Sequence, residues 1–572
     1  MNNIHEMRKK RGEIWDRAKA FLTEHQDENG MLSAEDTSQY ERMEQEVVDL
    51  GHAIEREERA AQLEREMNAP TASPLASRPE ARPNQRTGRG SDEYRSAFWT
   101  AMRNRGGHFS VQNALQIGTD SEGGYLVPDE YERTLVDALQ EENRLQTEYQ
   151  QLYASAQIPF AGKTLTVAQL APYKQDLDRA VRKSAFEAEG RFFDENREKF
   201  DEIYDRLVKN RTEQARRMGY ENFIPLGYIR MKRNGYGISE VEAYRKKIVE
   251  EMVPAVSELK KVQQKRIGAD SMQYFDDTFL FPDGNPVPFG SADEILTAGR
   301  QMYRALSPET AEFIDFMFRN ELFDVLAKEG KAPGGYCTYI PSQKSPFIFS
   351  NFNGTAGDVD VLTHEAGHAF AAYQAAKQNL LPEYADNTLE ACEVHSMSME
   401  FLTSDYHHLF FADQTDKYQL FHAESAVFFL PYGCMVDEFQ HIVYGNPEMT
   451  PQQRNEAWMI LEQKYRPYLT FGDLPFYGRG AGWQRQMHIY LNPFYYIDYC
   501  LAQTVALQFW ALYLKDPQDA WKRYLALVNQ AGTGTFVDVV KAAGLKSPFE
   551  DGCVKEAAEV SKEWCLAHQL KK

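Results

Sequence analysis

The sequence predicts a mainly α-helical protein with one small β-sheet. Apolar residues recur at intervals of three and four in two N-terminal segments, and residues 176–330 carry the same helical pattern almost throughout. Residues 334–340 and 346–352 are the clearest strand candidates, with β-branched and aromatic residues bounded by glycine or proline. With 572 residues, of which 42% are hydrophobic, the chain can bury a large core.

The first 67 residues predict a helical hairpin. Apolar stripes run through residues 4–21 and 40–61, on either side of a turn at residues 27–30. Ser33, followed closely by acidic residues, suits the start of the second helix. The spacing and the charged outer faces are typical of a coiled coil, so residues 1–67 offer a surface for self-association.

Residues 68–92 predict a disordered linker. They are rich in proline, glycine and arginine and contain too few apolar residues to pack. The arginines could also be read as a nucleic-acid patch, but the net charge of the chain is −21, which disfavours both nucleic acid and anionic membrane as general partners. We therefore expect neither a nucleic-acid nor a membrane partner.

The segment at residues 115–131 contains the run Gly-Gly-Tyr-Leu-Val-Pro and resembles the N-terminal part of a tailed-phage major capsid protein. The resemblance covers residues 1 to about 140. It implies that residues 1–67 correspond to a scaffolding region and that residues 93–140 are a capsid-like fragment, without the sheet domains of a capsid subunit. We expect a junction with an unrelated sequence near residues 139–143.

The clearest chemical motif is His364-Glu365-x-x-His368, in a stretch without proline. On a helix, residues four apart share a face, so the two imidazoles can bind one metal ion while Glu365 reaches the attacking water as a general base. Two neutral imidazoles suit Zn²⁺, which takes three protein ligands in catalytic sites. The alternative is a pair of surface histidines on an ordinary helix.

A second helical stretch, residues 387–401, offers the third ligand. Its glutamates at positions 390, 393 and 400 lie along one face. Buried carboxylates are costly unless they are paired or bound to a metal. Glu393 or Glu390 can therefore complete the site, and a further carboxylate can orient a ligand imidazole. A solvated acidic stripe is the alternative, but the methionine and phenylalanine residues between the acids argue against it.

Residues 363–370 and 393–401 closely resemble the oligoendopeptidase F family of thimet-oligopeptidase-like zinc metallopeptidases. The resemblance also includes residues 471–476, 483–490 and 493–503, and is continuous from about residue 141 to the C-terminus. In that superfamily the third ligand is a glutamate 25 residues after the second histidine, which selects Glu393 over Glu390. The resemblance thus implies one Zn²⁺ per chain, bound by His364, His368 and Glu393.

The resemblance also implies a large two-walled helical body around a deep cleft, with the small sheet beside the active-site helix. Residues 141–330 would form a truncated helical wall, since the family carries a further helical domain upstream. Residues 331–572 would form the zinc catalytic domain. Residues 349–353 would lie near the sheet edge where an extended substrate adds by backbone hydrogen bonding.

Amide hydrolysis passes through a tetrahedral oxyanion that needs hydrogen-bond donors besides the metal. By resemblance, His488, Tyr496 and Tyr499 serve this transition state, with Tyr495 as the substitute for Tyr496 at a register shifted by one residue. An aromatic cluster in the core is the alternative interpretation of these side chains.

The expected function is a zinc-dependent endopeptidase that hydrolyses internal bonds of short peptides, with Glu365 assisting attack by water. The alternative is a structural or assembly protein whose peptidase body is inactive because its N-terminal helical domain is missing. Six cysteines without a C-x-x-C pair suit a reducing compartment, and no apolar run resembles a signal or a membrane span. We therefore expect a cytoplasmic protein.

Overall fold

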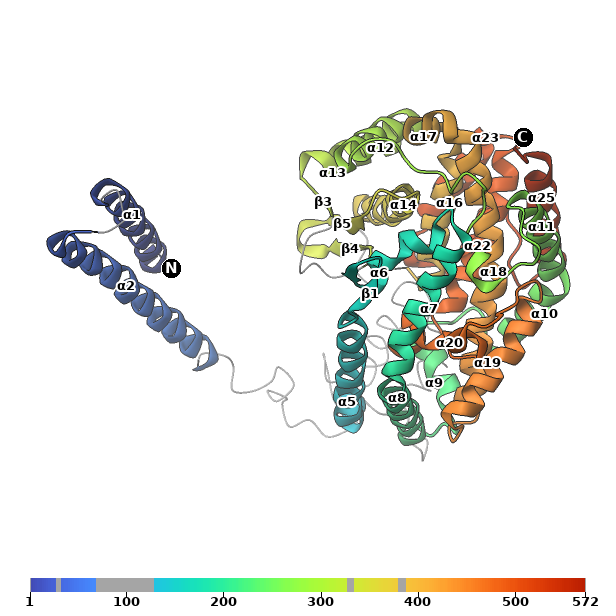
Figure 1. Cartoon of the computed structure of the whole chain (residues 1–572), viewed down its shortest axis with the longest axis horizontal. Coiled ribbons are helices and arrows are strands. Elements are labelled where there is room, and N and C mark those ends of the chain that lie inside the picture. Colours follow the sequence, from blue (N-terminus) through green and yellow to red (C-terminus); the bar gives the residue numbers. More distant parts are fainter. Residues whose placement is uncertain (1, 27–31, 68–127, 327–333, 379–386, 571–572) are drawn as a thin grey trace, which may run out of the picture. The chain divides into compact units, whose positions relative to one another are not determined.

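A computed structural model describes residues 2–26, 32–67, 128–326, 334–378 and 387–570 (Figure 1). The chain forms two compact units, residues 1–97 and 98–572. The predicted linker at residues 68–92 and the capsid-like segment up to residue 127 lie outside the described residues.

The first unit is the predicted helical hairpin. Its helices are α1 (Asn2–His25) and α2 (Ala34–Met67), which pack against each other. Ser33 accepts a hydrogen bond from the backbone N–H of Asp36 and so caps the start of α2. Arg11 of α1 donates to the backbone carbonyl of Val47 on α2 at 3.0 Å.

The second unit is mainly helical, as predicted, and contains two small sheets. Among the described residues its first helix is α5 (Pro128–Ala154). The described helices that follow up to the larger sheet are α6 (Val167–Leu170), α7 (Arg179–Glu195), α8 (Arg197–Arg217), α9 (Phe223–Arg230), α10 (Ile238–Lys247), α11 (Val253–Arg266), α12 (Ala292–Leu306) and α13 (Pro308–Arg319). The described helices after that sheet are α14 (Gly357–Lys377), α16 (Leu389–Leu402), α17 (His408–Phe411), α18 (Thr415–Gly445), α19 (Pro451–Tyr465), α20 (Pro475–Gly478), α21 (Met487–Leu491), α22 (Tyr496–Tyr513), α23 (Pro517–Val528), α24 (Phe536–Ala542) and α25 (Cys553–Ala567).

Helix α5 runs without interruption through residues 139–143, where the sequence predicts a junction. It packs against α8 through a buried ionic network. Glu142 accepts hydrogen bonds from Arg211 at 2.8 Å and from Arg230 at 2.9 Å. Arg211 also donates to the backbone carbonyl of Tyr490 at 2.6 Å. This network ties the first helix of the unit to the segment that precedes α22.

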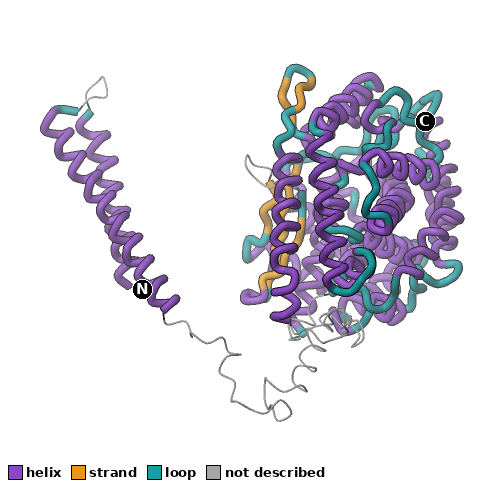
Figure 2. Tube along the Cα trace, turned by 90° about the horizontal axis from the view of Figure 1, so that it is seen from below, coloured by secondary structure: helices purple, strands orange, loops and turns teal. Residues whose placement is uncertain are grey.

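The larger sheet has the strand order β3-β5-β4, with bounds β3 (Phe323–Leu326), β4 (Tyr336–Ile340) and β5 (Ser345–Phe352). The other sheet is a hairpin of β1 (Ile158–Phe160) and β2 (Lys163–Leu165) (Figure 2). Both predicted strands are therefore confirmed. The expectation that residues 349–353 lie at the substrate edge is wrong, because β3 pairs in parallel with β5 and makes it the central strand.

Helix α16 packs against α14 on one side and α22 on another, and α14 packs on the larger sheet. Gly367 allows the close approach of α14 to α16, since a Cβ there would lie 2.6 Å from the Cα of Ser396 and 2.7 Å from the carbonyl oxygen of His395. The described helices include none with the length and apolar character that a membrane crossing requires.

Candidate active site

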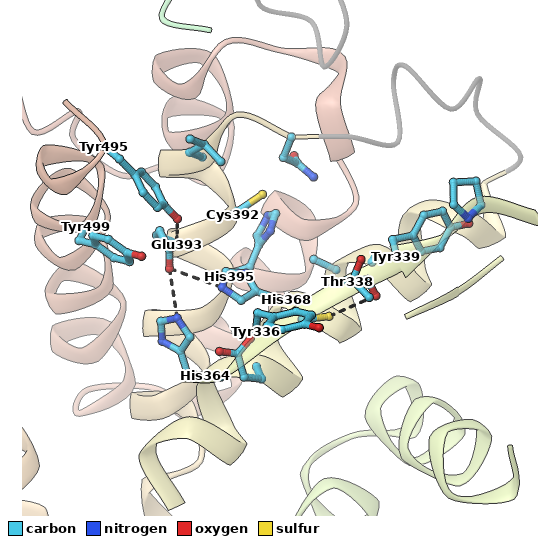
Figure 3. Close-up of a pocket in the computed structure, with 18 residues that line it drawn as sticks. Tyr336, Thr338, Tyr339, His364, His368, Cys392, Glu393, His395, Tyr495 and Tyr499 are labelled. Carbon is cyan, nitrogen blue, oxygen red and sulfur yellow. Dashed lines mark hydrogen bonds and ion pairs between the residues drawn. The ribbon is translucent and has the colours of Figure 1, made fainter. Parts of the chain in front are cut away.

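A cavity of about 500 Å³ lies among β4, α14, α16 and the start of α22 (Figure 3). Strand β4 contributes one wall through Tyr336, Thr338 and neighbouring residues. Strand β4 is at the edge of the sheet, and its residues line the cavity. The sheet edge beside the cavity is therefore at residues 336–340 and not at the predicted residues 349–353.

The two histidines of the motif and Glu393 meet in this cavity. His364 and His368 lie one turn apart on α14, and Glu393 projects from α16. The ligand atoms of the three residues lie within 4.8 Å of one another, and Oε2 of Glu393 is 3.2 Å from Nε2 of His364. Of the residues that the structure describes, these three are the one His, Cys, Asp and Glu group whose geometry could hold a metal ion. Two imidazoles and a carboxylate facing a cavity are a donor set that fits Zn²⁺.

Glu390, the alternative third ligand, lies outside this group. Its side chain is buried, and its Oε2 atom has no hydrogen-bond partner in the described structure. Burial and the nearby carboxylate of Asp498 raise the pKa of Glu390 to about 8. The carboxyl group is therefore mostly protonated at neutral pH, which makes it a poor metal ligand as it stands.

Glu400 holds His364 in one orientation. Its Oε1 atom lies 2.7 Å from Nδ1 of His364, and its Oε2 atom lies 2.8 Å from Nε2 of His422 on α18. Burial alone would raise the pKa of Glu400, but the two histidines lower it to about 2. The ionised carboxylate accepts the Nδ1 proton of His364 and leaves the Nε2 lone pair toward Glu393 and His368. The sequence pattern did not single out His422.

Glu365 lines the same cavity and is 7% exposed. Burial raises the pKa of its carboxyl group, an effect that the neighbouring histidines oppose. A carboxylate with a raised pKa is a better proton acceptor than an exposed glutamate.

The tyrosines divide between two cavities. Tyr495 and Tyr499 line the cavity that contains Glu393, and the Tyr495 hydroxyl donates to Oε1 of Glu393 at 2.6 Å. Tyr496, which the resemblance favoured, lines a second cavity instead. Tyr495, which the resemblance offered in place of Tyr496, is therefore the tyrosine that is hydrogen-bonded to a predicted metal ligand. Tyr499 lines the same cavity as the three predicted metal ligands, and its transition-state role stays a prediction.

His488 packs beside these tyrosines, with its ring centroid 5.8 Å from that of Tyr495 and 5.7 Å from that of Tyr499. Burial lowers the pKa of His488 to about 4, so the imidazole is neutral at neutral pH. The Gln486 amide donates to Nδ1 of His488 at 2.8 Å, and the Tyr432 hydroxyl donates to Oε1 of Gln486 at 2.8 Å. Because Nδ1 accepts, the proton of the neutral ring is on Nε2.

Gln486 and Tyr432 are contacts that the sequence pattern missed. Gln486 precedes His488 by two residues, a spacing that carries no helical signal, and Tyr432 comes from α18. Only the fold brings α18 next to the 486–488 segment.

The chain is similar to known peptidases in sequence and in fold. The sequence profile described as peptidase family M3 matches residues 310–559. The solved structure of PZ peptidase A with inhibitor 2 is 39% identical, covers 98% of this chain and 97% of its own, and superposes with a TM-score of 0.75. A putative oligoendopeptidase F from Bacillus anthracis is 44% identical over 83% of this chain and 80% of its own, with a TM-score of 0.71.

A curated relative, an oligoendopeptidase F homolog of Borreliella burgdorferi, is 25% identical over 240 residues, which are 40% of this chain and 39% of the relative. The chain spans less than two thirds of the length of the curated relatives that it matches. The two solved structures, by contrast, align along most of their length at well above 30% identity. The chain therefore belongs to peptidase family M3, among the homologues of oligoendopeptidase F.

Proposed function

We propose that this chain is a zinc-dependent endopeptidase that hydrolyses internal peptide bonds of short oligopeptides. The observation that carries the proposal is the convergence of His364, His368 and Glu393 within 4.8 Å, in a cavity that Glu365 also lines. Membership of a peptidase family supports it. An inactive assembly protein is the weaker candidate, because such a protein has no need to hold these four side chains together in a cavity.

His364, His368 and Glu393 would hold one Zn²⁺ per chain. Bound there, Zn²⁺ would supply a Lewis acid that polarises the scissile carbonyl and lowers the pKa of the attacking water. Glu365 accepts the proton of that water and delivers it to the leaving amine. The raised pKa of Glu365 suits a group that takes up and releases a proton in one cycle.

The chain also offers donors for the oxyanion. Burial raises the pKa of Tyr499, so its phenol keeps its proton. His488 is neutral and carries its proton on Nε2 through the hydrogen bond from Gln486. We assign Tyr499 and His488 to the oxyanion. Tyr495 instead orients Glu393, and Tyr496 lies in the adjoining cavity.

Strand β4 supports an extended peptide as substrate. Within the described residues it pairs with β5 on one side and with no strand on the other. The residues from Gly335 to Tyr339 line the cavity. A peptide that adds to this free edge would align its backbone across the cavity, and pockets for alternate side chains would set preference.

The proposal also assigns roles to the other parts of the chain. Residues 141–330 form a helical wall domain and residues 331–572 the catalytic domain, while residues 1–67 self-associate as a coiled coil. The capsid-like origin of residues 1 to about 140 rests on the sequence resemblance alone.

The direct test of the proposal is cleavage of a short, internally quenched peptide before and after removal of metal by a chelator. We expect cleavage to stop on chelation and to return with one equivalent of Zn²⁺. Cleavage that persists in the metal-free protein would overturn the proposal. An absence of cleavage in protein that holds one equivalent of zinc would favour the inactive assembly protein.

A further inference from the structure

A second cavity, of about 640 Å³, adjoins the proposed oxyanion donors. Its walls come from α7, α11, α18 and the segment at residues 485–496, together with the loop before α12. Phe428, Phe429 and Tyr432 give it an aromatic surface. It is therefore large enough, and apolar enough, to accept part of a peptide.

This cavity also contains an unusual number of charges. Four cationic side chains line it, and three of them form close ion pairs. The pairs are Lys174 with Glu189, Lys260 with Asp277 at 2.7 Å, and Arg466 with Glu462 at 2.6 Å. The fourth cation, Arg485, is left over, so the lining and its partners carry one surplus positive charge.

In the described part of the chain, Arg485 shares its ion-pair partner Glu189 with Lys174. Its Nε atom is buried without a hydrogen bond in the described structure, and the nearest carboxylate oxygen, Oε2 of Glu189, is 3.8 Å away. That carboxylate already pairs with Lys174 and accepts a hydrogen bond from the Tyr477 hydroxyl. The Arg485 side chain is 33% exposed, so the guanidinium group has lost part of its hydration, and a carboxylate that enters the cavity would offer it a charge-assisted hydrogen bond.

His488 packs against one tyrosine of each cavity. The ring of His488 packs 5.0 Å from that of Tyr496, which lines the second cavity, and 5.8 Å from that of Tyr495, which lines the first. Gln486, the hydrogen-bond partner of His488, also lines the second cavity. A peptide that occupies the second cavity would therefore approach the oxyanion donors.

We propose that the second cavity is a substrate subsite in which Arg485 binds a carboxylate of the peptide. The inference rests on the proposed function and adds the substrate class, namely peptides with a carboxylate near the cleaved bond. That carboxylate is the C-terminus of the peptide or an acidic side chain, since a guanidinium group binds both as a bidentate partner. The aromatic side chains of the cavity contact the apolar part of the peptide residue that carries the carboxylate.

The test compares peptides that differ in one carboxylate. One pair has the same sequence with a free C-terminus or a C-terminal amide, and a second pair is amidated and differs by Glu or Gln near that end. Each is assayed with the zinc-loaded wild type, Arg485→Met and Arg479→Met. Arg479 is a matched control because it is a nearby arginine of the same chain region that does not line the cavity and pairs with Asp194.

We expect the wild type to favour the carboxylate member of at least one pair by about tenfold or more in kcat/KM, since a charge-assisted hydrogen bond is worth this much. The preference disappears in Arg485→Met and remains in Arg479→Met. Arg485→Lys, which keeps the charge without the bidentate geometry, retains part of it and guards against a folding defect in the methionine variant. The pair that shows the preference identifies the C-terminus or the side chain as the ligand.

Binding to the Glu365→Gln protein, with and without Arg485→Met, separates this inference from the proposed function. Peptides that bind with an Arg485-dependent carboxylate preference support the subsite even if no peptide is cleaved, whereas failed cleavage counts only against the peptidase. Equal affinities and equal kcat/KM values for both members of each pair, in the wild type and in Arg485→Met, would overturn the subsite while leaving the peptidase intact.

Discussion

The hydroxyl group of Tyr495 donates a 2.6 Å hydrogen bond to Oε1 of Glu393, and the other carboxylate oxygen of Glu393 lies 3.2 Å from Nε2 of His364. One oxygen of Glu393 thus accepts a hydrogen bond from the residue that precedes α22, and the other faces the two imidazoles. The hydrogen bond makes Tyr495 a positioning residue for the predicted metal group.

Tyr495→Phe removes this hydrogen bond while leaving the ring in place. We expect the zinc affinity to fall by about 10-fold to 100-fold, as for other groups that orient metal ligands. Competition with a chromophoric chelator measures it. Tyr496→Phe is the matched control, since Tyr496 lines the other cavity. Equal zinc affinities in the two variants would show that Tyr495 does not position Glu393.

The third ligand is tested by comparing two glutamates one helical turn apart. Glu393→Gln should lose most bound zinc, because a neutral amide replaces the carboxylate that faces both histidines. Glu390→Gln should keep one equivalent, because its carboxyl group is buried away from the group and is already largely protonated near pH 7. Elemental analysis of the purified proteins decides between them, and the reverse result would move the ligand to Glu390.

Gln486→Glu tests the proposed protonation of His488. A carboxylate at this position can only accept a hydrogen bond, so it favours the tautomer of His488 with the proton on Nδ1. Nε2 would then carry no proton at neutral pH. We expect kcat to fall by about tenfold or more with little change in KM. Relative to the wild type, the loss should shrink as the pH falls, because a doubly protonated ring regains its Nε2 proton. A ratio of variant to wild-type kcat that does not change with pH would contradict this assignment.

The Glu142 network gives a pH-dependent stability. Burial alone would raise the pKa of Glu142, but Arg211 and Arg230 lower it to about 2 from an ordinary 4.5. The stabilisation is therefore complete above about pH 4.5 and is lost as the pH falls toward about 2. The shift corresponds to about 3 kcal/mol near pH 7.

Glu142→Gln should accordingly lower the free energy of unfolding by about 3 kcal/mol near pH 7, and by clearly less at about pH 3. Urea denaturation at both pH values measures the difference. Glu141→Gln is the control, since the more exposed ion pairs of Glu141 are worth less than about 1 kcal/mol. An equal loss for Glu142→Gln at both pH values would show that the charge of Glu142 is not the cause.

Local sequence predicts much of this molecule. The four-residue spacing of His364 and His368 places both on one face of α14, and the apolar spacing predicts the hairpin of α1 and α2. The choice of Glu393 over Glu390 needed the family resemblance, because both glutamates lie on the same helix and periodicity alone does not separate them.

The rest depends on contacts between distant segments. Strand β3 has only four residues. Because it pairs with β5, strand β5 is central and the edge strand beside the cavity is β4. Which of Tyr495 and Tyr496 reaches Glu393 depends on the turn before α22. Phe494 in this turn has a left-handed φ of 68°, which no sequence pattern predicts. Glu400 and His422 are 22 residues apart on different helices, so only packing brings them together.

The central claim, a zinc site with Glu365 as general base, is tested most directly by measuring zinc content and peptide cleavage together in Glu365→Gln. The substitution leaves His364, His368 and Glu393 in place and removes only the proton acceptor. We predict one equivalent of bound zinc and a kcat lower by about 10²-fold to 10⁴-fold. Zinc-loaded Glu365→Gln that cleaves peptides at nearly the wild-type rate would contradict the account.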